Sequence, residues 1–284
     1  MAEAEIESRE NEAEDKGFMA KVKKELREWG VTLSIFIPVY LVFTTFIYEL
    51  RSIPSESMLP NLAVGDRVAV NKFAYGYSRE SVPFGMGKYL PLGDGRLFAR
   101  EPKRGDVVVF QHPHYPRVMI KRLIGVPGDR IEMRGEKLYL NGEEVATEYL
   151  GSRQFRQHSS GRTVRAQEFL EALPGGRSYT VGDFRDTPAD NTVKFAVPDG
   201  HYFFMGDNRD DSLDSRATSG HCPAVDGVIF KTGCEPRVAA VDASIGFVPF
   251  DNLIGRADTV LFTIGLCRDR DGHECPPGRV WKPL

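Results

Sequence analysis

The chain has 284 residues, a hydrophobic content of 41% and a charged content of 27%, all ordinary values for a globular protein. Its net charge is −3 and its basic residues form no clustered stripe, which argues against a nucleic-acid partner. The length is enough for one large domain or two small ones.

Residues 1–29 form a polar tail that starts acidic and carries basic residues towards its end. The acidic part has little to bury, which predicts disorder. Residues 30–48 carry no charge, and Trp29 and Tyr48 flank this apolar run as interfacial aromatics do. About 18 helical residues span ~27 Å, close to the thickness of the hydrocarbon core. We therefore predict a membrane anchor with its N-terminus in the cytoplasm, because the basic residues precede it.

Two alternatives to an uncleaved anchor are a cleavable signal peptide and a buried core helix. The leading segment is long, and residues 44–48 offer no small-x-small cleavage site. Core helices usually carry some polar positions. We therefore expect residues 49–284 to form an extracytoplasmic domain behind a retained anchor.

Beyond the anchor the pattern predicts mainly β structure. Asn141 and Gly142 separate two strand-like runs, which is typical of a tight hairpin. Residues 150–200 are polar and rich in turns, with one helix expected at 166–172. Strands are expected where β-branched apolar runs are bounded by Gly or Pro: at 107–110, 118–126, 197–205 and 259–264.

All four cysteines fall late in the chain, and none has a spacing typical of a metal site. An even number outside the cytoplasm favours disulfides over four reduced, buried thiols. We expect the sequence-local pairs Cys222–Cys234 and Cys267–Cys275, since each closes a short polar loop. The acidic run after Asp207 fails as an EF-hand, because Ser215 stands where the loop needs Gly.

The stretch from Ile53 to Pro60 presents two serines, Ser55 and Ser57, just beyond the apolar run. Pro54 and Pro60 restrict the backbone and keep the stretch extended. A serine held this way stays presented at a surface. The alternative is a pair of ordinary turn residues.

Residues 55–60, 121–129 and 206–216 resemble the motif boxes of bacterial type I signal (leader) peptidases. Residues 104–110 resemble a further box, and residues 255–257 the closing one. The resemblance covers most of residues 30–265. It implies that Ser57 is the nucleophile and Lys121 the general base. It also implies that the Ser55 side chain donates to the oxyanion and that Ser212 orients the base. Asp214 and Arg216 would form a supporting pair.

The chemistry of these residue types agrees with the resemblance. A serine hydroxyl needs an adjacent base, and none of the six histidines lies in a Ser/His/Asp-like motif. A lysine can act as base only when neutral, and the apolar run around Lys121 would desolvate it. Both faces of that strand are apolar, so the pattern does not distinguish Lys121 from Arg122 as the base. Arginine cannot be deprotonated, which leaves Lys121. The alternative for Lys121 is a surface lysine.

Two departures from the family pattern concern the surroundings of the nucleophile. Glu56 stands where the family often has glycine, which adds a charge beside Ser57. Residues 217–245 form an insertion where the family usually passes almost directly.

The resemblance implies a mostly β fold: a transmembrane helix, then a catalytic domain with a smaller β-rich subdomain near residues 132–200. It implies a membrane-bound serine endopeptidase that removes signal peptides from exported preproteins, with no metal or cofactor. The substrate would add a strand along Ile53, Pro54 and the Lys121 strand, with Ile53 and Ile120 lining shallow pockets. The expected location is the inner membrane of a bacterium, single-pass; the expected partners are preprotein signal peptides and membrane lipid, with the secretion machinery left open.

Two other functions remain open at this point. One is a related Ser/Lys peptidase with a dedicated substrate, such as a pilus subunit. The other is an anchored β-rich adaptor without activity, which the presence of both Ser57 and Lys121 disfavours.

Overall fold

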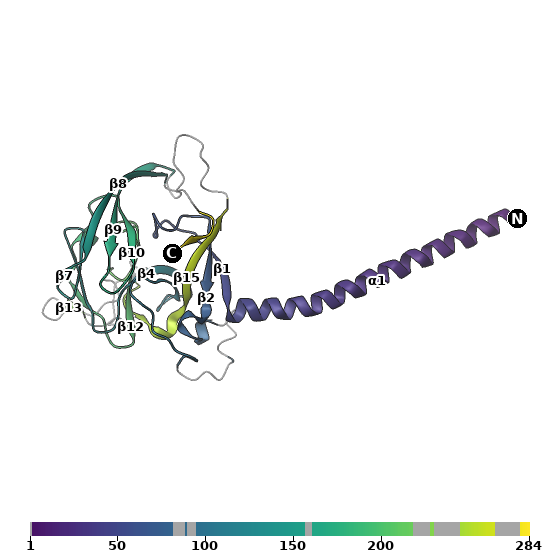
Figure 1. Cartoon of the computed structure of the whole chain (residues 1–284), viewed down its shortest axis with the longest axis horizontal. Coiled ribbons are helices and arrows are strands. Elements are labelled where there is room, and N and C mark those ends of the chain that lie inside the picture. Colours follow the sequence, from purple (N-terminus) through teal and green to yellow (C-terminus); the bar gives the residue numbers. More distant parts are fainter. Residues whose placement is uncertain are drawn as a thin grey trace. The chain divides into compact units, whose positions relative to one another are not determined.

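The computed structural model describes residues 2–81, 89, 95–156, 161–217, 228–229, 245–264 and 279–284 (Figure 1). The chain forms two compact units, Met1–Phe46 and Ile47–Leu284. The four cysteines, and most of the predicted insertion 217–245, lie outside the described residues.

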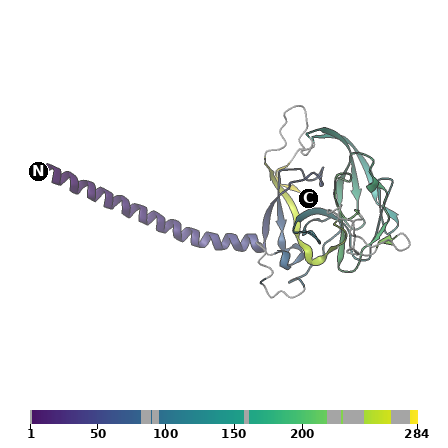
Figure 2. The ribbon, with the colours of Figure 1, turned by 180° about the vertical axis from the view of Figure 1, so that it is seen from behind.

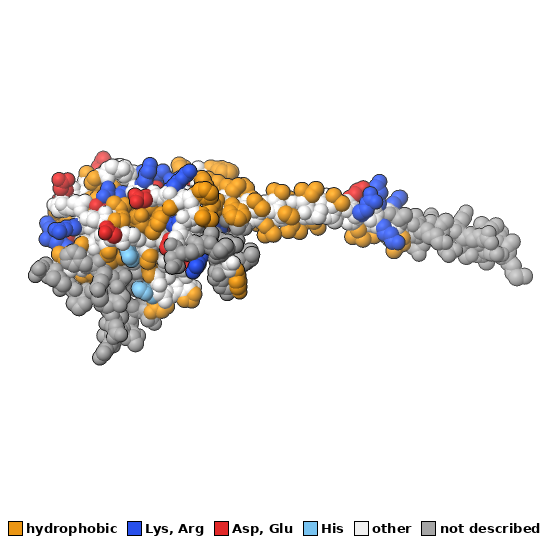
Figure 3. All heavy atoms as spheres, turned by 90° about the horizontal axis from the view of Figure 1, so that it is seen from below, with side chains coloured by type: hydrophobic (Ala, Val, Ile, Leu, Met, Phe, Trp, Pro, Cys, Tyr) orange, Lys and Arg blue, Asp and Glu red, His pale blue; other side chains and the backbone are white. Residues whose placement is uncertain are grey.

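The first unit is one helix, α1 (Ala2–Phe46), with Pro38 inside it. The predicted disorder of the acidic part of the tail is therefore wrong: Ala and Glu dominate that part, and both are strong helix formers. Its stretch Lys21–Thr44, with a mean hydropathy of 1.4, is long and apolar enough to cross a membrane. Figure 3 shows basic side chains gathered on α1 at the N-terminal end of this stretch.

The apolar stretch contains hydroxyl groups that hydrogen-bond within the helix. Thr32 Oγ1 donates to the carbonyl oxygen of Glu28 at 2.9 Å, and Thr44 Oγ1 to that of Tyr40 at 2.9 Å. These bonds pair the hydroxyls without solvent. The helix stops two residues short of the predicted anchor end, and Tyr48 begins a strand instead.

The second unit is built on an eight-stranded main sheet with the order β1-β2-β15-β3-β4-β12-β14, in which β16 also pairs with β15. Its named strands pair antiparallel. The strands are β1 (Tyr48–Ser52), β2 (Asp66–Asn71), β3 (Val107–Gln111), β4 (Val118–Gly125), β12 (His201–Met205), β14 (Val248–Pro249), β15 (Leu253–Thr263) and β16 (Lys282–Pro283).

Two smaller sheets complete this unit, with the orders β10-β9-β8 and β13-β11-β5-β6-β7. In Figures 1 and 2 their teal and green strands lie on one side of the unit, and β1, β2 and β15 on the other. Short 3-10 turns η1 (Lys72–Tyr75), η2 (Arg79–Ser81), η4 (Pro188–Asp190) and η5 (Phe250–Asn252) connect strands. The strands are β5 (Arg130–Arg134), β6 (Lys137–Leu140), β7 (Glu143–Glu144), β8 (Ala146–Arg156), β9 (Thr163–Ala172), β10 (Ser178–Asp183), β11 (Lys194–Ala196) and β13 (Val228–Ile229).

The predicted mostly β fold is confirmed, as are the strands at β3 and β4. The predicted hairpin joins β6 to β7, with positive φ angles of 55° at Asn141 and 91° at Gly142. The predicted helix at 166–172 is wrong, because that segment belongs to β9. There, pairing with β8 and β10 and the burial of Ala166 and Glu171 outweigh the helix propensity of its residues.

The core positions the strands that carry the site. One buried cluster lies between β3, β4, β12 and β15, where the rings of Phe110 and Phe204 stack at 4.6 Å. A second cluster contains Ile53, Met58 and Leu62 together with residues of β2, β3 and β15. The segment between β1 and β2 is therefore anchored in the core, and this segment carries Ser57.

Candidate active site

The segment between β1 and β2 is a closed loop of residues 53–66, called here the nucleophile loop. Ile53 N donates to Asp66 O and Gly65 N donates to Ile53 O, both at 2.9 Å, which closes the loop at its base. Met58 and Leu62 are fully buried beneath it, and Leu62 N donates to Met58 O. Both ends and the floor of the loop are fixed, so Ser57 has little freedom to move.

Ser57 and Lys121 are in direct contact, because β4 carries Lys121 towards the nucleophile loop. Lys121 Nζ is hydrogen-bonded to Ser57 Oγ, and only 2% of Lys121 is exposed. Burial lowers the pKa of Lys121 to about 8 from its ordinary value of 10.5, although Asp214 and Asp207 act to raise it. An amine with this pKa can lose its proton near neutral pH and take the proton of a serine hydroxyl.

Ser55 lies at the open side of this pair, with its Oγ 3.4 Å from Ser57 Oγ. It is exposed, whereas Ser57 is buried. Of the predicted substrate contacts, Pro54 is exposed, Ile53 is buried, and Ile120 is half-buried and packs on the same cluster as Ile53. The structure thus brings Ser55, Ser57, Lys121 and the two isoleucines together.

The loop of residues 206–216 clamps the backbone on the other side of Ser57. Asn208 N donates to Ser57 O, and Asn208 Nδ2 donates to Glu56 O, both at 3.2 Å. Gly206 passes so close that a Cβ atom there would lie 2.4 Å from Ser57 O. Only glycine permits this approach. Glu56, the residue that departs from the family pattern, is buried.

Asp214 and Arg216 form a buried ion pair, in which Nη2 lies 2.9 Å from Oδ2 and Nε lies 3.0 Å from Oδ1. Burial acts to raise the pKa of Asp214, but Arg216 and the backbone N–H of Gly206 outweigh it, so that this pKa lies below its ordinary value. The pair sets the shape of the 206–216 loop, because Asp214 accepts from Gly206 N and Arg216 Nη2 donates to Arg209 O.

Ser212 lies in the same loop, and its hydroxyl would stand 2.3 Å from a Cβ added to Gly206. Its Oγ is buried and makes no hydrogen bond to any described residue, Lys121 included. The structure places this serine in the site without the lysine contact that the resemblance implies.

A buried charge network beneath the site was missed by sequence reasoning. Arg122, considered only as a rejected base, makes a two-pronged ion pair with Asp207 at 2.6 and 2.7 Å. Its guanidinium lies 4.1 Å from the ring centre of Tyr179. Tyr179 in turn donates to Glu171, which pairs with Arg209. These residues come from four separate segments, so no local motif in the sequence predicts the network.

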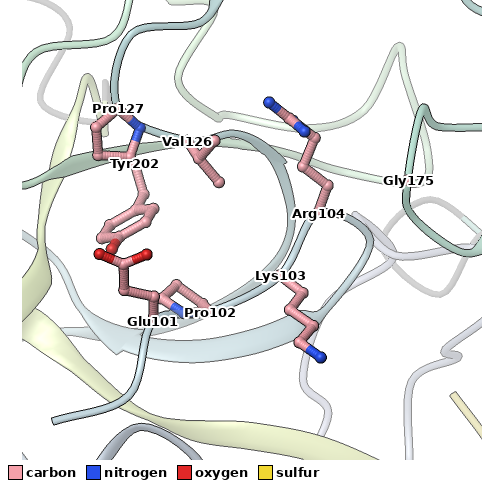
Figure 4. A pocket seen from close by; sticks show the side chains of 8 residues that line it. All are labelled: Glu101, Pro102, Lys103, Arg104, Val126, Pro127, Gly175 and Tyr202. Atoms are coloured by element: carbon pink, nitrogen blue, oxygen red, sulfur yellow. The ribbon is translucent and has the colours of Figure 1, made fainter.

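A cavity of about 430 Å³ lies elsewhere, between the start of β3, the end of β4 and β12 (Figure 4). The side chains of Glu101 and Tyr202 point towards each other there; burial and the nearby Glu101 carboxylate raise the pKa of Tyr202 to about 12. No predicted site residue lines this cavity. Among the described residues no group of three or more His, Cys, Asp or Glu side chains could hold a metal ion.

A serine hydroxyl held against a buried lysine amine, in a mostly β unit, is the arrangement that a Ser/Lys hydrolase requires. The family model described as "Signal peptidase, peptidase S26" matches residues 26–262. The chain belongs to this family and is therefore a peptidase.

Similar proteins include "Signal peptidase I" of Rickettsia massiliae, 34% identical over 249 residues that cover 85% of this chain and 81% of that protein. "Signal peptidase I" of Rickettsia typhi is 34% identical over 251 residues, covering 86% and 83%. A solved signal peptidase I from Enterococcus faecalis is 25% identical and covers 55% of this chain and 97% of its own, with a TM-score of 0.28. The assignment to the family rests on the sequence matches.

Proposed function

We propose that this protein is a membrane-anchored serine endopeptidase that removes N-terminal signal peptides from exported preproteins. The observation that carries the proposal is the contact between Ser57 Oγ and the buried Nζ of Lys121. The named relatives are signal peptidases I, which supports the choice of substrate.

In the proposed reaction, neutral Lys121 takes the proton of Ser57 as Ser57 Oγ attacks the carbonyl carbon of the scissile peptide bond. The oxyanion that forms is stabilised by the Ser57 N–H and the Ser55 hydroxyl. Lys121 then passes the proton to the leaving amine, and the signal peptide stays on Ser57 as an ester. Water, deprotonated by Lys121, hydrolyses the ester and restores Ser57.

The open edge of β4 supports the mode of substrate binding. β4 pairs with β3 from Val118 to Arg122, but β12 pairs with it only from Arg122 onwards. Within the described residues, the other edge of Val118–Lys121 therefore has no strand beside it. An extended signal-peptide segment can add a strand there and end beside Ser57. Ile53 and Ile120 would form the floor of shallow pockets that accept small side chains such as that of alanine.

The helix α1 supports the anchoring. We propose that its apolar stretch crosses the inner membrane of a bacterium once, that lipid surrounds it, and that the catalytic unit lies on the extracytoplasmic side. The basic residues at the N-terminal end of the stretch would keep the N-terminus in the cytoplasm: Lys21, Lys23, Lys24 and Arg27.

Cleavage of a secretory preprotein with alanine at minus one and minus three tests the function. The detergent-solubilised full chain should release the mature protein, whereas Ser57→Ala and Lys121→Met should give no product. Lys121→Arg should also be inactive, because a guanidinium stays protonated. Ser52→Ala, an exposed serine on β1, is the matched control. Normal turnover by any of the three site variants would refute the mechanism, and failure of the wild type on unrelated preproteins would favour a dedicated substrate.

A further inference from the structure

The segment Arg279–Leu284 lies against the nucleophile loop, although it falls beyond the residues matched by the family model. Its strand β16 pairs with β15, with Lys282 opposite Val260. Leu284 packs on the cluster that contains Ile53, Met58 and Leu62. The segment is thus part of the wall behind Ser57.

Arg279 binds the loop at two points. Its Nη1 forms an ion pair with Asp66, and its Nη2 donates to the carbonyl oxygen of Pro60 at 3.4 Å. Arg279 is 8% exposed and Asp66 is 0% exposed, so water does not compete for this pair. Asp66 closes the loop, because its backbone oxygen accepts from Ile53 and its carboxylate accepts from Ala63 N. Arg279 therefore holds both the base of the loop and the stretch that follows Ser57.

Lys282 contacts Asn61, the residue after Pro60, because its Nζ lies 3.4 Å from Asn61 O. The side chain of Asn61 donates to Asp207 at 2.8 Å, and Asp207 is the ion-pair partner of Arg122. Arg122 directly follows Lys121 on β4. The segment that carries the nucleophile and the strand that carries the base are thus connected through Asn61, and Lys282 contacts the same residue at its backbone carbonyl.

We infer that Arg279 and Lys282 are positioning residues, which hold the nucleophile loop so that Ser57 Oγ stays within hydrogen-bond reach of Lys121. The inference rests on the proposed function. Neither residue touches the reacting atoms. Their effect is expected on the rate of the chemical step, because displacing a reacting group by about 1 Å can cost roughly a hundredfold in rate.

The main variant combines Arg279→Met with Asp66→Asn, so that no unpaired charge is left buried. The Asp66 carboxylate also accepts from the Thr263 hydroxyl. An amide at position 66 can still accept from Ala63 N and donate to that hydroxyl, whereas the contact on Pro60 is lost. The assay uses the full chain in detergent with a peptide that carries alanine at minus one and minus three. We expect kcat to fall roughly tenfold with KM within about twofold of wild type.

The pH profile separates positioning from general loosening of the fold. The ascending limb of kcat/KM should stay where it is in the wild type, because the burial of Lys121 is unchanged. A limb displaced towards the ordinary lysine value, or a kcat within about twofold of wild type, would overturn the inference.

Lys282→Met gives a second test that leaves the Arg279–Asp66 pair intact, and it decides the matter if the double variant does not fold. We expect a several-fold fall in kcat, recovered by Lys282→Arg, which restores a donor. Val280→Ala is the control, since Val280 lies in the same segment and is 66% exposed. Activity that is lost in Ser57→Ala but normal in Lys282→Met would overturn this inference alone, and activity that persists in Ser57→Ala would overturn the proposed function.

Discussion

Lys121 titrates near pH 8 because its amine is buried, and this single group should set the pH dependence of cleavage. Below that pH the amine is charged and cannot accept the proton of Ser57. The value of kcat/KM should therefore rise with pH along a limb centred near 8. The measurement is kcat/KM between pH 5 and 11 on a soluble peptide. A limb near the unperturbed histidine value of about 6.5, lost on replacing a histidine, would contradict the lysine base.

The same pKa predicts how stability depends on pH. Below about 8 both the folded and the unfolded chain protonate Lys121, and the buried charge costs its full penalty. Between about 8 and 10.5 only the unfolded chain holds that proton, so stability should rise with pH, by up to about 3 kcal/mol. Urea unfolding at a series of pH values measures this slope. Lys121→Met should remove this contribution, and an unchanged slope in that variant would show that other groups cause it.

Ser55 gives a third prediction at the scale of single residues. Its hydroxyl lies beside that of Ser57 on the open side of the pair, where it can donate to an oxyanion. Ser55→Ala should lower kcat by roughly 10²–10³ and change KM much less. Steady-state kinetics beside Ser52→Ala provide the comparison. A kcat within about twofold of wild type would exclude the role.

The sequence was informative about residues in recognisable motifs and uninformative about residues that only pair with others. Ser57 and Lys121 were singled out because residues 55–60 and 121–129 resemble the family motif boxes, and the structure brings the two side chains together. Arg122 and Asp207 are ordinary charged residues, and they meet only because β4 lies beside β12. Arg279 could not be connected to Pro60 without the pairing of β16 with β15.

At the scale of elements, the backbone of the 206–216 loop lies very close to that of Ser57 at Gly206. A substitution of Gly206 tests whether this close contact matters. A methyl group at Gly206 would overlap Ser57 O and the Ser212 hydroxyl, at 2.4 and 2.3 Å. Gly206→Ala should therefore displace the nucleophile and lower kcat at least tenfold, because neither neighbour can move without disturbing the site. Gly95→Ala is the control, since a Cβ there meets nothing within 4 Å. Equal activity of the two variants would show that the loop has room.

Local patterns predicted elements well where one signal dominated. The Asn141-Gly142 turn, and the β-branched runs of β3 and β4, were found because turn chemistry and strand propensity agree. The segment 166–172 was mistaken for a helix because its partners β8 and β10 lie outside any local window. The length of α1 was underestimated for the opposite reason: its acidic start has no apolar face, and only its residue propensities favour a helix.

At the scale of the whole molecule, the chain divides after Phe46 into the helix that we propose as the membrane anchor and the unit that carries Ser57 and Lys121. A chain that lacks residues 1–46 should remain folded, because the residues of its core clusters all lie in the second unit. We expect it to cleave a soluble peptide and to lose co-sedimentation with lipid vesicles. Circular dichroism, peptide cleavage and sedimentation beside the full chain measure this. A truncated chain that unfolds, or that binds vesicles as the full chain does, would contradict the division of labour.

The pairing of the four cysteines is a further property of the whole chain, and it stays a prediction from the sequence. The pairs Cys222–Cys234 and Cys267–Cys275 would each close a short loop, and all four cysteines lie outside the described residues. Mass spectrometry of unreduced peptides should find these two links. Four free thiols, or crossed links, would contradict them.

The position of β15 has a consequence for the synthesis of this peptidase, because a strand from late in the chain lies between two early hairpins. The loop that carries Ser57 joins β1 to β2, Lys121 lies on β4, and β15 stands between β2 and β3 in the main sheet. While the chain is being made, β1–β2 and β3–β4 emerge as two separate hairpins, and residues 253–263 are among the last elements to follow. Pairing across so long a stretch of chain is slow compared with forming a hairpin. If Ser57 and Lys121 act together as proposed, we expect the nascent chain to gain activity late, once β15 has paired with both β2 and β3.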